Sequence, residues 1–251
     1  MIGLIKGPEK IIKENIIIHT SNENSDLIYK KIFKLKNISN LDAFFFPVSF
    51  IFLNFGIFKI IRKILNVILV FFINIVIKLF IFISSYSLKD GFLDDKEIKF
   101  VYKELINKKT PFFIRNEDYY KWRFNYKKYN KNYAFSLLYK KRIVAHNITI
   151  SKKYKFLEST FIMDMISNQD IQVIGKFIIL LNIIKTALQN NSDFIFTLIN
   201  KNSLSYKRLF KYFLIKIPSF FLPHSTPVYI KNEGSLKFNN IHLTLSDLDY
   251  F

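Results

Sequence analysis

The spacing of apolar residues divides the chain into stretches of helical period and stretches of strand period. Both occur between Glu158 and Asn190. Residues 159–166 are almost continuously apolar, as in a buried strand, and residues 172–189 place apolar side chains on one face of a helix. The turn between them, residues 167–170, offers helix caps. A strand–turn–helix of this kind directs free backbone N–H groups at one point, so we predict an anion site there.

The same reasoning predicts the remaining elements. From residue 133 onward the order is β-β-β-α-β-α-β, so we predict an α/β (α+β) fold in which an antiparallel meander leads into a helical crossover. The expected strands are 133–139, 143–151, 156–166, 193–199 and 227–230, with 241–245 as a further candidate. The expected helices are 96–107, the segment after Asn116, 172–190 and 204–213. Nearer the start we expect strands within 11–20 and 35–38, and a helix at 26–33.

Residues 44–84 are the most apolar part of the chain. The window 64–83 has the length of a membrane span, which needs roughly 20 residues. Lys59, Lys63, Asn66, Asn74 and Lys78 fall close to one helical face. Three interpretations compete: a helix in the membrane interface with its lysines toward the headgroups, a true span, and a helix packed against the protein. We favour an interfacial or protein-packed helix.

Composition narrows the function classes. The chain has no cysteine and only four histidines, without metal-ligand spacing, so we expect no metal site. The formal charge is +19, but 33 of the 38 basic residues are lysines and only five are arginines, which most often read base edges. We therefore expect no nucleic-acid partner. Anionic membranes and acidic substrates remain candidates.

Two sequence motifs carry a resemblance to a known superfamily. Residues 115–124, Arg-Asn-Glu-Asp-Tyr-Tyr-Lys-Trp-Arg-Phe, are similar to an "Arg-Asp-x-x-Tyr-Leu-x-Trp-Arg-Tyr" opening, and residues 242–249 are similar to a "Trp-x-Leu-Thr-x-Gly-Asp-x-Asp" ending. Both belong to a branch of the GCN5-related N-acetyltransferase (GNAT) superfamily that is associated with polysaccharide and cell-surface biosynthesis. In this chain His242 and Ser246 replace the usual Trp and Gly. The resemblance covers about residues 114–250 and implies a GNAT-like mixed, mostly antiparallel sheet flanked by helices.

An internal repeat bears on domain organisation. The segment 22–33, Asn-x-Asn-Ser followed by Tyr-Lys-Lys-Ile-Phe, is echoed by 200–210, Asn-x-Asn-Ser followed by Tyr-Lys-Arg-Leu-Phe. The superfamily often ends its last strand–helix unit this way, and the branch often carries two domains in tandem. We therefore expect a remnant of a first GNAT-like domain at 1–43, an apolar helical linker at 44–88 and a GNAT-like acyltransferase domain at 89–251. On this interpretation the first domain is truncated.

The resemblance also implies the site residues. Gln172-Val-Ile-Gly175-Lys176-Phe177 partly matches the "Gln/Arg-x-x-Gly-x-Gly/Ala" turn that binds the pyrophosphate of acyl-coenzyme A, although Phe177 stands where Gly or Ala is usual. An acyl-CoA such as acetyl-CoA is thus the expected donor, and Gly175→Trp is expected to block it without unfolding the domain. The expected donor-binding residues are Ile166, Gln172, Gly175, Lys176, Asn200 and Ser203.

Direct acyl transfer needs a base for the acceptor and an acid for the departing thiolate. Asp164 is the preferred base because a carboxylate among apolar neighbours is costly unless it has a partner or a role, and Glu158 is the alternative. Tyr206 or Tyr212 is the expected acid, as implied by the resemblance.

The predicted function is transfer of an acyl group to an amine or hydroxyl of a polysaccharide or envelope precursor, in the cytoplasm or at the inner face of the membrane. The alternatives are a catalytically inactive GNAT-like relic or binding module, and a membrane-anchored envelope-assembly protein.

Overall fold

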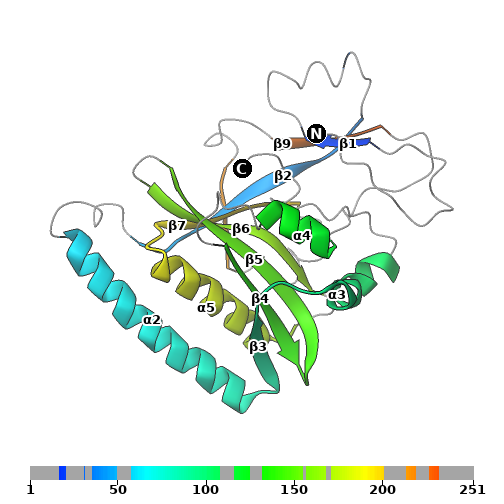
Figure 1. Cartoon of the computed structure of the whole chain (residues 1–251). Coiled ribbons are helices and arrows are strands. Elements are labelled where there is room, and N and C mark those ends of the chain that lie inside the picture. The colour runs from blue at the N-terminus through cyan, green and yellow to red at the C-terminus, as the bar shows by residue number, and fades with distance from the viewer. Residues whose placement is uncertain are drawn as a thin grey trace.

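The computed structural model describes residues 17–20, 31, 36–49, 58–107, 116–124, 132–154, 157–167, 171–200, 213–218 and 226–231. Within these residues nine strands form one sheet in the order β1-β9-β2-β7-β6-β5-β4-β3, with β8 beside β2 (Figure 1). The strands are β1 Ile17–Thr20, β2 Lys36–Pro47, β3 Tyr86–Asp90, β4 Asn132–Tyr139, β5 Arg142–Tyr154, β6 Leu157–Ser167, β7 Phe194–Ile199, β8 Ile215–Lys216 and β9 Thr226–Lys231.

The sheet is mixed and mostly antiparallel, as predicted. Every paired strand runs antiparallel to its neighbour except β6 and β7, which are parallel. A right-handed crossover is the usual way to join two parallel neighbours, and here the connection is helix α5, Val173–Gln189. The predicted meander and crossover are therefore confirmed.

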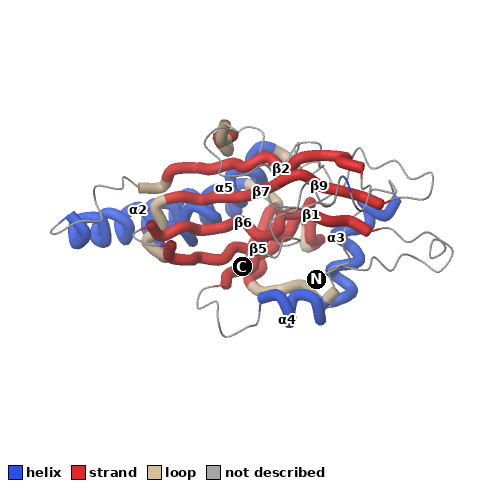
Figure 2. The backbone as a smooth tube through the Cα atoms, turned by 90° about the horizontal axis from the view of Figure 1, so that it is seen from above, coloured by secondary structure: helices blue, strands red, loops and turns tan. Residues whose placement is uncertain are grey.

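Helices cover both faces of the sheet (Figure 2). Helices α3, Asp95–Asn107, and α4, Glu117–Phe124, share one apolar core with the sheet. Helix α5 and the long helix α2, Phe58–Ile83, share the second core on the opposite face. The layers are thus α3 and α4, then the sheet, then α5 and finally α2.

Local sequence signals explain several boundaries. Asp94 and Glu97 form a reciprocal capping box at the start of α3: the Glu97 N–H donates to Asp94 Oδ1 at 2.8 Å, and the Asp94 N–H donates to Glu97 Oε2 at 3.2 Å. Asn116 caps α4 by accepting from the Tyr119 N–H at 2.9 Å. Lys140 and Lys141 both have positive φ, 48° and 65°, which suits the tight turn of the β4–β5 hairpin.

Strand β2 extends into the segment that was predicted as a linker. Residues 44–47 belong to this strand, and the apolar helix begins only at Phe58. Consecutive side chains of β2 face opposite cores, because Ala43 packs with α3 and α4 whereas Phe44 packs with α5. Residues 43–46 of β2 are all apolar, as in a strand with neighbours on both faces, so this part of the strand resembles a buried helix in sequence. β2 lies between β7 and β9 in the common sheet.

Helix α2 packs along α5 through a narrow stripe that includes polar side chains. Arg62 is buried and donates from Nη1 to Asp193 Oδ1 at 2.9 Å and from Nη2 to the Asn191 carbonyl. Asn66 donates to the Leu188 carbonyl at 3.3 Å and to Asn191 Oδ1 at 3.1 Å. The polar residues that were predicted to share one helical face therefore have different surroundings. Asn66 faces the protein, while Lys59, Lys63 and Lys78 are exposed.

Three expected elements cannot be compared. The helices at 26–33 and 204–213 and the strand at 241–245 lie outside the described residues, apart from Lys31 and Phe213.

Candidate functional site

The two parallel strands at the centre of the sheet pair only where they begin. Their register joins Ser159 to Phe194, Thr160 to Ile195 and Phe161 to Phe196. Beyond this point the Thr197 hydroxyl donates to the Ile162 carbonyl at 2.9 Å, so a side chain takes the place of a backbone partner. The carboxyl-terminal halves of β6 and β7 are therefore not joined by backbone pairing, as predicted for a fold with an opening between them.

A β-bulge in β6 changes which residues face each core. Ile148 of β5 lies opposite Asp164 and Thr149 lies opposite Ile162, so Met163 is an extra residue. Such a bulge puts two successive side chains on the same side of the sheet. Met163 packs in the α3–α4 core, and Asp164 accepts from the Tyr102 hydroxyl of α3. The carboxylate of Asp164 thus faces α3, whereas its neighbours Ile162 and Met165 face α5.

The first turn of α5 lies at the end of this opening. Gln172 precedes the helix, and its carbonyl accepts the first intrahelical bond, from the Lys176 N–H at 3.1 Å. The N–H groups of residues 173–175 have no helical carbonyl partner, and no side chain caps the helix start. This turn contains no acidic residue. The helix dipole and Lys176 therefore make the position favourable for an anion.

Gly175 has a packing role at this turn. A Cβ atom at position 175 would lie 2.5 Å from Ile171 Cγ2 and 2.8 Å from Tyr86 Cζ, which is closer than atoms can approach. The hydroxyl of Tyr86 also accepts from the Gln172 N–H at 3.2 Å. The expectation that Gly175→Trp leaves the domain folded is therefore wrong, since an indole at this buried position has to displace both neighbours.

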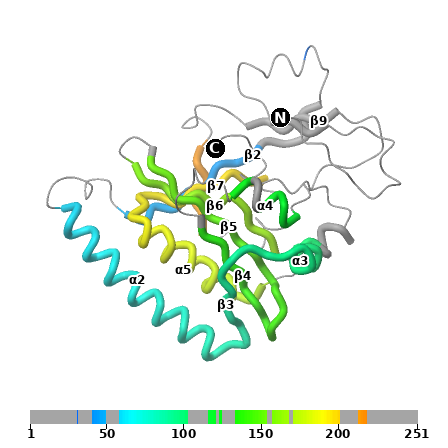
Figure 3. Tube along the Cα trace, in the orientation of Figure 1, coloured from blue at the N-terminus to red at the C-terminus, as the bar shows by residue number. Residues whose placement is uncertain are grey.

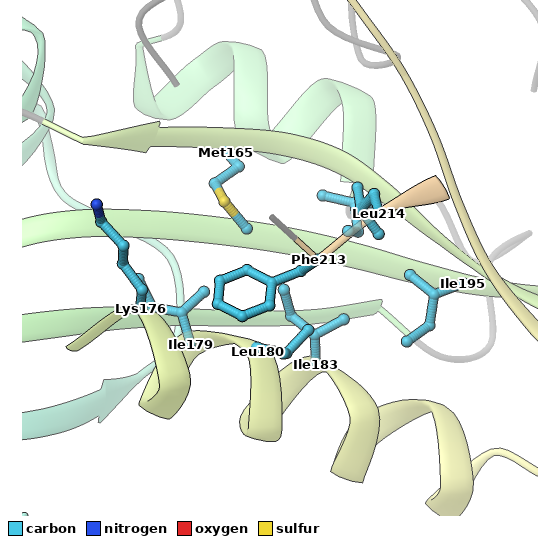
Figure 4. A pocket seen from close by; sticks show the side chains of 9 residues that line it. Met165, Lys176, Ile179, Leu180, Ile183, Ile195, Phe213 and Leu214 are labelled. Carbon is cyan, nitrogen blue, oxygen red and sulfur yellow. The ribbon is translucent and has the colours of Figure 1, made fainter. Parts of the chain in front are cut away.

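A small cavity lies between the sheet and α5 below the opening (Figure 4). Its volume is about 20 Å³, room for about one water molecule. Phe213 reaches over it toward α5 and contacts Phe177 edge to face, with ring centroids 5.5 Å apart. The lining residues are Ile162, Met165, Lys176, Ile179, Leu180, Ile183, Ile195, Phe213 and Leu214.

A group of buried polar side chains occupies the opposite face of the sheet. Asp164 is 1% exposed, and its Oδ2 lies 3.2 Å from the Tyr102 hydroxyl that donates to it. His146 is 1% exposed and its Nδ1 lies 2.9 Å from Ser136 Oγ. No described residue forms a hydrogen bond with His146 Nε2.

Burial controls the protonation of His146. Desolvation lowers its pKa to about 4, and the nearby carboxylates of Asp164 and Glu97 only partly oppose this shift. The imidazole is therefore neutral at pH 7. His146 and Asp164 are both buried on the face of the sheet that α3 and α4 cover.

The structure brings some predicted site residues together and separates others. Ile166, Gln172, Gly175, Lys176 and Asn200 lie where β6 ends, α5 begins and β7 ends, which is one edge of the sheet because the strands are parallel. Glu158 lies at the other end of β6, about 26 Å away along the strand. Its backbone N–H donates to Asp193 Oδ2 at 2.9 Å. Ser203, Tyr206 and Tyr212 lie outside the described residues.

Sequence reasoning missed the partners that hold these residues. Tyr86, Tyr102, Ser136, His146 and Thr197 come from five different elements, and none carries a local sequence motif. The one available signal is the polar residue in an apolar strand, which marks Thr197 and His146 as it marks Asp164. Among the described residues no group of three or more His, Cys, Asp or Glu side chains could hold a metal ion.

Comparison with known proteins concerns the fold alone. No protein-family model and no curated protein sequence matches the chain. A solved structure of a GCN5-related N-acetyltransferase from Anabaena variabilis matches with a TM-score of 0.50 and 9% identity, over 85% of this chain and 45% of that one. The chain thus spans less than half the length of that protein.

Two further solved structures match at lower TM-scores and add no argument. One is a GCN5-related N-acetyltransferase from Sphaerobacter thermophilus, with a TM-score of 0.46, 6% identity, and coverage of 90% of this chain and 63% of that one. The other is the C-terminal domain of a putative lysylphosphatidylglycerol synthetase from Agrobacterium fabrum, with a TM-score of 0.37, 10% identity, and coverage of 86% and 67%. The match to the Anabaena structure, together with the mixed and mostly antiparallel sheet, shows that the chain has a GNAT-like fold.

Proposed function

We propose that this chain transfers an acyl group from an acyl-CoA donor, such as acetyl-CoA, to an amine or hydroxyl acceptor. The observation that carries the proposal is that β6–β7 pairing ends at Phe161 and Phe196, and that the unpaired carboxyl-terminal half of β6 leads to the uncapped first turn of α5. Divergent parallel strands leave backbone groups available to a ligand, and the helix start supplies N–H donors for its phosphates. The GNAT-like fold supports this placement of the donor.

The reaction exchanges the C–S bond of the donor for a new C–N or C–O bond and moves one proton from the acceptor to the thiolate. The acceptor nitrogen or oxygen attacks the thioester carbonyl, the new C–N or C–O bond forms, and the C–S bond breaks. A base removes the acceptor proton and an acid protonates the thiolate. We assign the base to Asp164 and the acid to Tyr206, with Glu158 a weaker candidate because it lies at the far end of β6.

The assignment of Asp164 has a structural requirement. Its carboxylate is buried and held by the Tyr102 hydroxyl. An acceptor can reach it only when α3 moves away from β6, so the catalytic assignment implies displacement of Tyr102. A Tyr102→Phe variant removes the hydrogen bond but keeps the ring, and it tests whether this contact positions the carboxylate.

Donor binding is tested by titration calorimetry and thermal shift with acetyl-CoA and the purified full chain. Lys176→Glu introduces an acid into the first turn of α5, where it repels the pyrophosphate, and it is expected to weaken binding at least about tenfold. Lys152→Glu, an exposed lysine on β5, makes the same charge change elsewhere and is the matched control. Absence of saturable binding at millimolar acetyl-CoA would refute the proposal.

The acceptor class is proposed from the sequence resemblance. We propose a polysaccharide or envelope precursor, handled in the cytoplasm or at the inner face of the membrane. Among the described residues one helix, α2, is long and apolar enough to cross a membrane by length and composition, and 11% of its most apolar window is buried.

A binding module without catalysis is the second candidate. Phe177 stands where the superfamily has a small residue, and its ring contacts Phe80 of α2 and Phe213. These rings occupy space that close approach of a donor would use. Phe177→Ala separates the two candidates, because it should raise the affinity of an active enzyme for acetyl-CoA and leave a module unable to bind it.

A further inference from the structure

Helix α2 presents an exposed face that is apolar along its whole length. The helix is 26 residues long, or about 39 Å. Side chains such as Ile64, Val67, Phe71, Phe72 and Phe82 are between 56% and 87% exposed. At 100° per residue, the exposed apolar side chains span about 200° of the circumference. Exposed apolar surfaces of this extent mark sites that bind a membrane or another protein.

The polar residues of α2 lie on the inner face or at the border of the apolar face. Arg62 and Asn66 are buried against α5, where they bond to Asp193, Asn191 and Leu188. Lys59, Lys63 and Lys78 are exposed, and the helix contains no acidic residue. Its charge is therefore entirely positive, which fits a partner that is apolar inside and anionic at its surface.

The packing of α2 against the domain determines how the helix can be oriented relative to a bilayer. The inner stripe contacts the domain from Arg62 to Phe80: Arg62 bonds to Asp193, Ile77 is buried in the α5 core, and the Phe80 ring lies 6.4 Å from that of Phe177. A helix crossing a bilayer would need lipid or membrane-embedded protein on every side. Because one side of α2 is covered by a domain with exposed charges, the helix has to lie along the bilayer surface.

The start of α5, beside the end of α2, also has exposed apolar side chains. Val173 is 64% exposed and Phe177 is 40% exposed, and Phe177 contacts Phe80 near the end of α2. Figure 3 shows α2 running alongside α5 on the outer side of the molecule. The candidate donor-binding turn therefore lies next to the C-terminal end of α2.

We propose that α2 is an in-plane membrane anchor, which inserts its apolar face into an anionic lipid bilayer and holds the start of α5 at the headgroup level. Lys63 and Lys78, at the border of the apolar face, contact the anionic headgroups, and Arg62 stays within the protein. A second copy of the chain suits this face less well, because two α2 helices would bring lysines together without any acid on either helix.

Vesicle flotation of the purified full chain tests the proposal. The chain should float with phosphatidylcholine vesicles that contain phosphatidylglycerol, and binding should weaken with rising salt. Phe72→Glu replaces an inserted aromatic ring with a charge, so partitioning should fall at least about tenfold. Phe100→Glu, at an exposed phenylalanine of α3, is the matched control and should bind as the parent does.

Depth measurements distinguish a helix in the plane from a span. Tryptophans introduced by Phe72→Trp and by Phe82→Trp lie about 15 Å apart along the helix. After subtraction of the Trp122 signal, lipids brominated near the headgroup should quench both tryptophans equally. Unequal depths would overturn the in-plane orientation.

Two other outcomes would overturn the anchor itself. One is failure of the folded chain to float with anionic vesicles. The other is a dimer in light scattering that Phe72→Glu dissociates, together with no vesicle binding, which would assign the face to a second copy. Neither assay contains acyl-CoA, so a negative result here does not bear on the proposed donor site, which the acetyl-CoA titration tests separately.

Discussion

His146 lies in β5 beside the ring of Tyr120, and its burial has a consequence for stability against acid. The unfolded chain takes up a proton at this residue near pH 6.5, whereas the native protein does so only near pH 4. The free energy of unfolding should therefore fall as the pH drops from about 6.5 to 4, by about 3 kcal/mol in total.

Urea melts between pH 7.5 and 4.5 measure this dependence. His146→Gln should lose the contribution of this residue, so its stability should fall less steeply with acid than that of the parent. If His146→Gln lowers the unfolding free energy by the same amount at every pH, that loss comes from altered packing and does not affect the comparison of slopes. His19→Gln serves as the control, and an unchanged slope in His146→Gln would contradict the assignment.

Gly175 allows a second prediction at the scale of single residues. In most helices Gly→Ala stabilises by about 1 kcal/mol. At position 175 the added methyl would overlap Ile171 Cγ2 and the ring of Tyr86, so we expect Gly175→Ala to destabilise by about 1–3 kcal/mol. Gln189→Ala in the same helix is exposed and should be near neutral. Calorimetric melting of the two variants decides the sign.

The sequence predicted that some polar residues need partners but not which partners they have. A carboxylate at 164 in an apolar strand indicated a partner, and the structure supplies Tyr102. Tyr102 is 62 residues away in the sequence, and helical period alone marks it as an ordinary core residue. His146 and Ser136 pair across two strands. Such contacts depend on register, which the sequence of one strand does not contain.

At the scale of elements, α2 is attached to the domain by a buried ion pair. Arg62 and Asp193 have side chains that are 5% and 1% exposed, and their charged atoms lie 2.9 Å apart. Arg62→Met leaves the Asp193 carboxylate buried without its cation, so we expect a loss of about 3–5 kcal/mol in unfolding free energy. The double variant Arg62→Met with Asp193→Asn should recover part of that loss.

The surface ion pair between Lys216 and Asp42 offers a matched control. Its N–O distance is 2.6 Å, but the lysine side chain is 53% exposed. Lys216→Met should therefore change the unfolding free energy by less than about 1 kcal/mol. Denaturant melts of the variants give all these values, and equal effects at Arg62 and Lys216 would show that the pair near α2 does not anchor the helix.

Elements with strong local signals were predictable, and those defined by distant pairing were not. The β4–β5 hairpin and α5 follow from alternation, from the turn at Lys140 and Lys141, and from helical period. The orientation of α2 did not follow, because its polar positions suggested a face toward headgroups and Asn66 instead bonds to α5. Period alone assigns residues to faces but does not say which face is inside.

At the scale of the molecule, the sheet depends on a strand from the beginning of the chain. β2 pairs with β7 over Asp42–Pro47 and with β9 over Lys36–Leu41, so it joins two strands from the far end of the sequence. Such pairing between distant segments leaves no mark in local periodicity, which is why residues 44–47 were predicted as part of a linker. The boundary predicted at residue 89 divides the sequence within one continuous sheet.

Two fragments test the importance of β2. A chain of residues 50–251 lacks this strand and exposes the edge of β7 as well as the core positions of Leu41, Ala43 and Phe44. We expect it to bind hydrophobic dyes and to unfold without a cooperative transition. Of the described strands, a chain of residues 36–251 lacks only β1, whose one described partner is β9, and this chain should unfold cooperatively. A synthetic peptide of residues 36–49 should restore a transition to the shorter fragment by strand addition. Cooperative unfolding of 50–251 without the peptide would mean that the domain folds independently of β2.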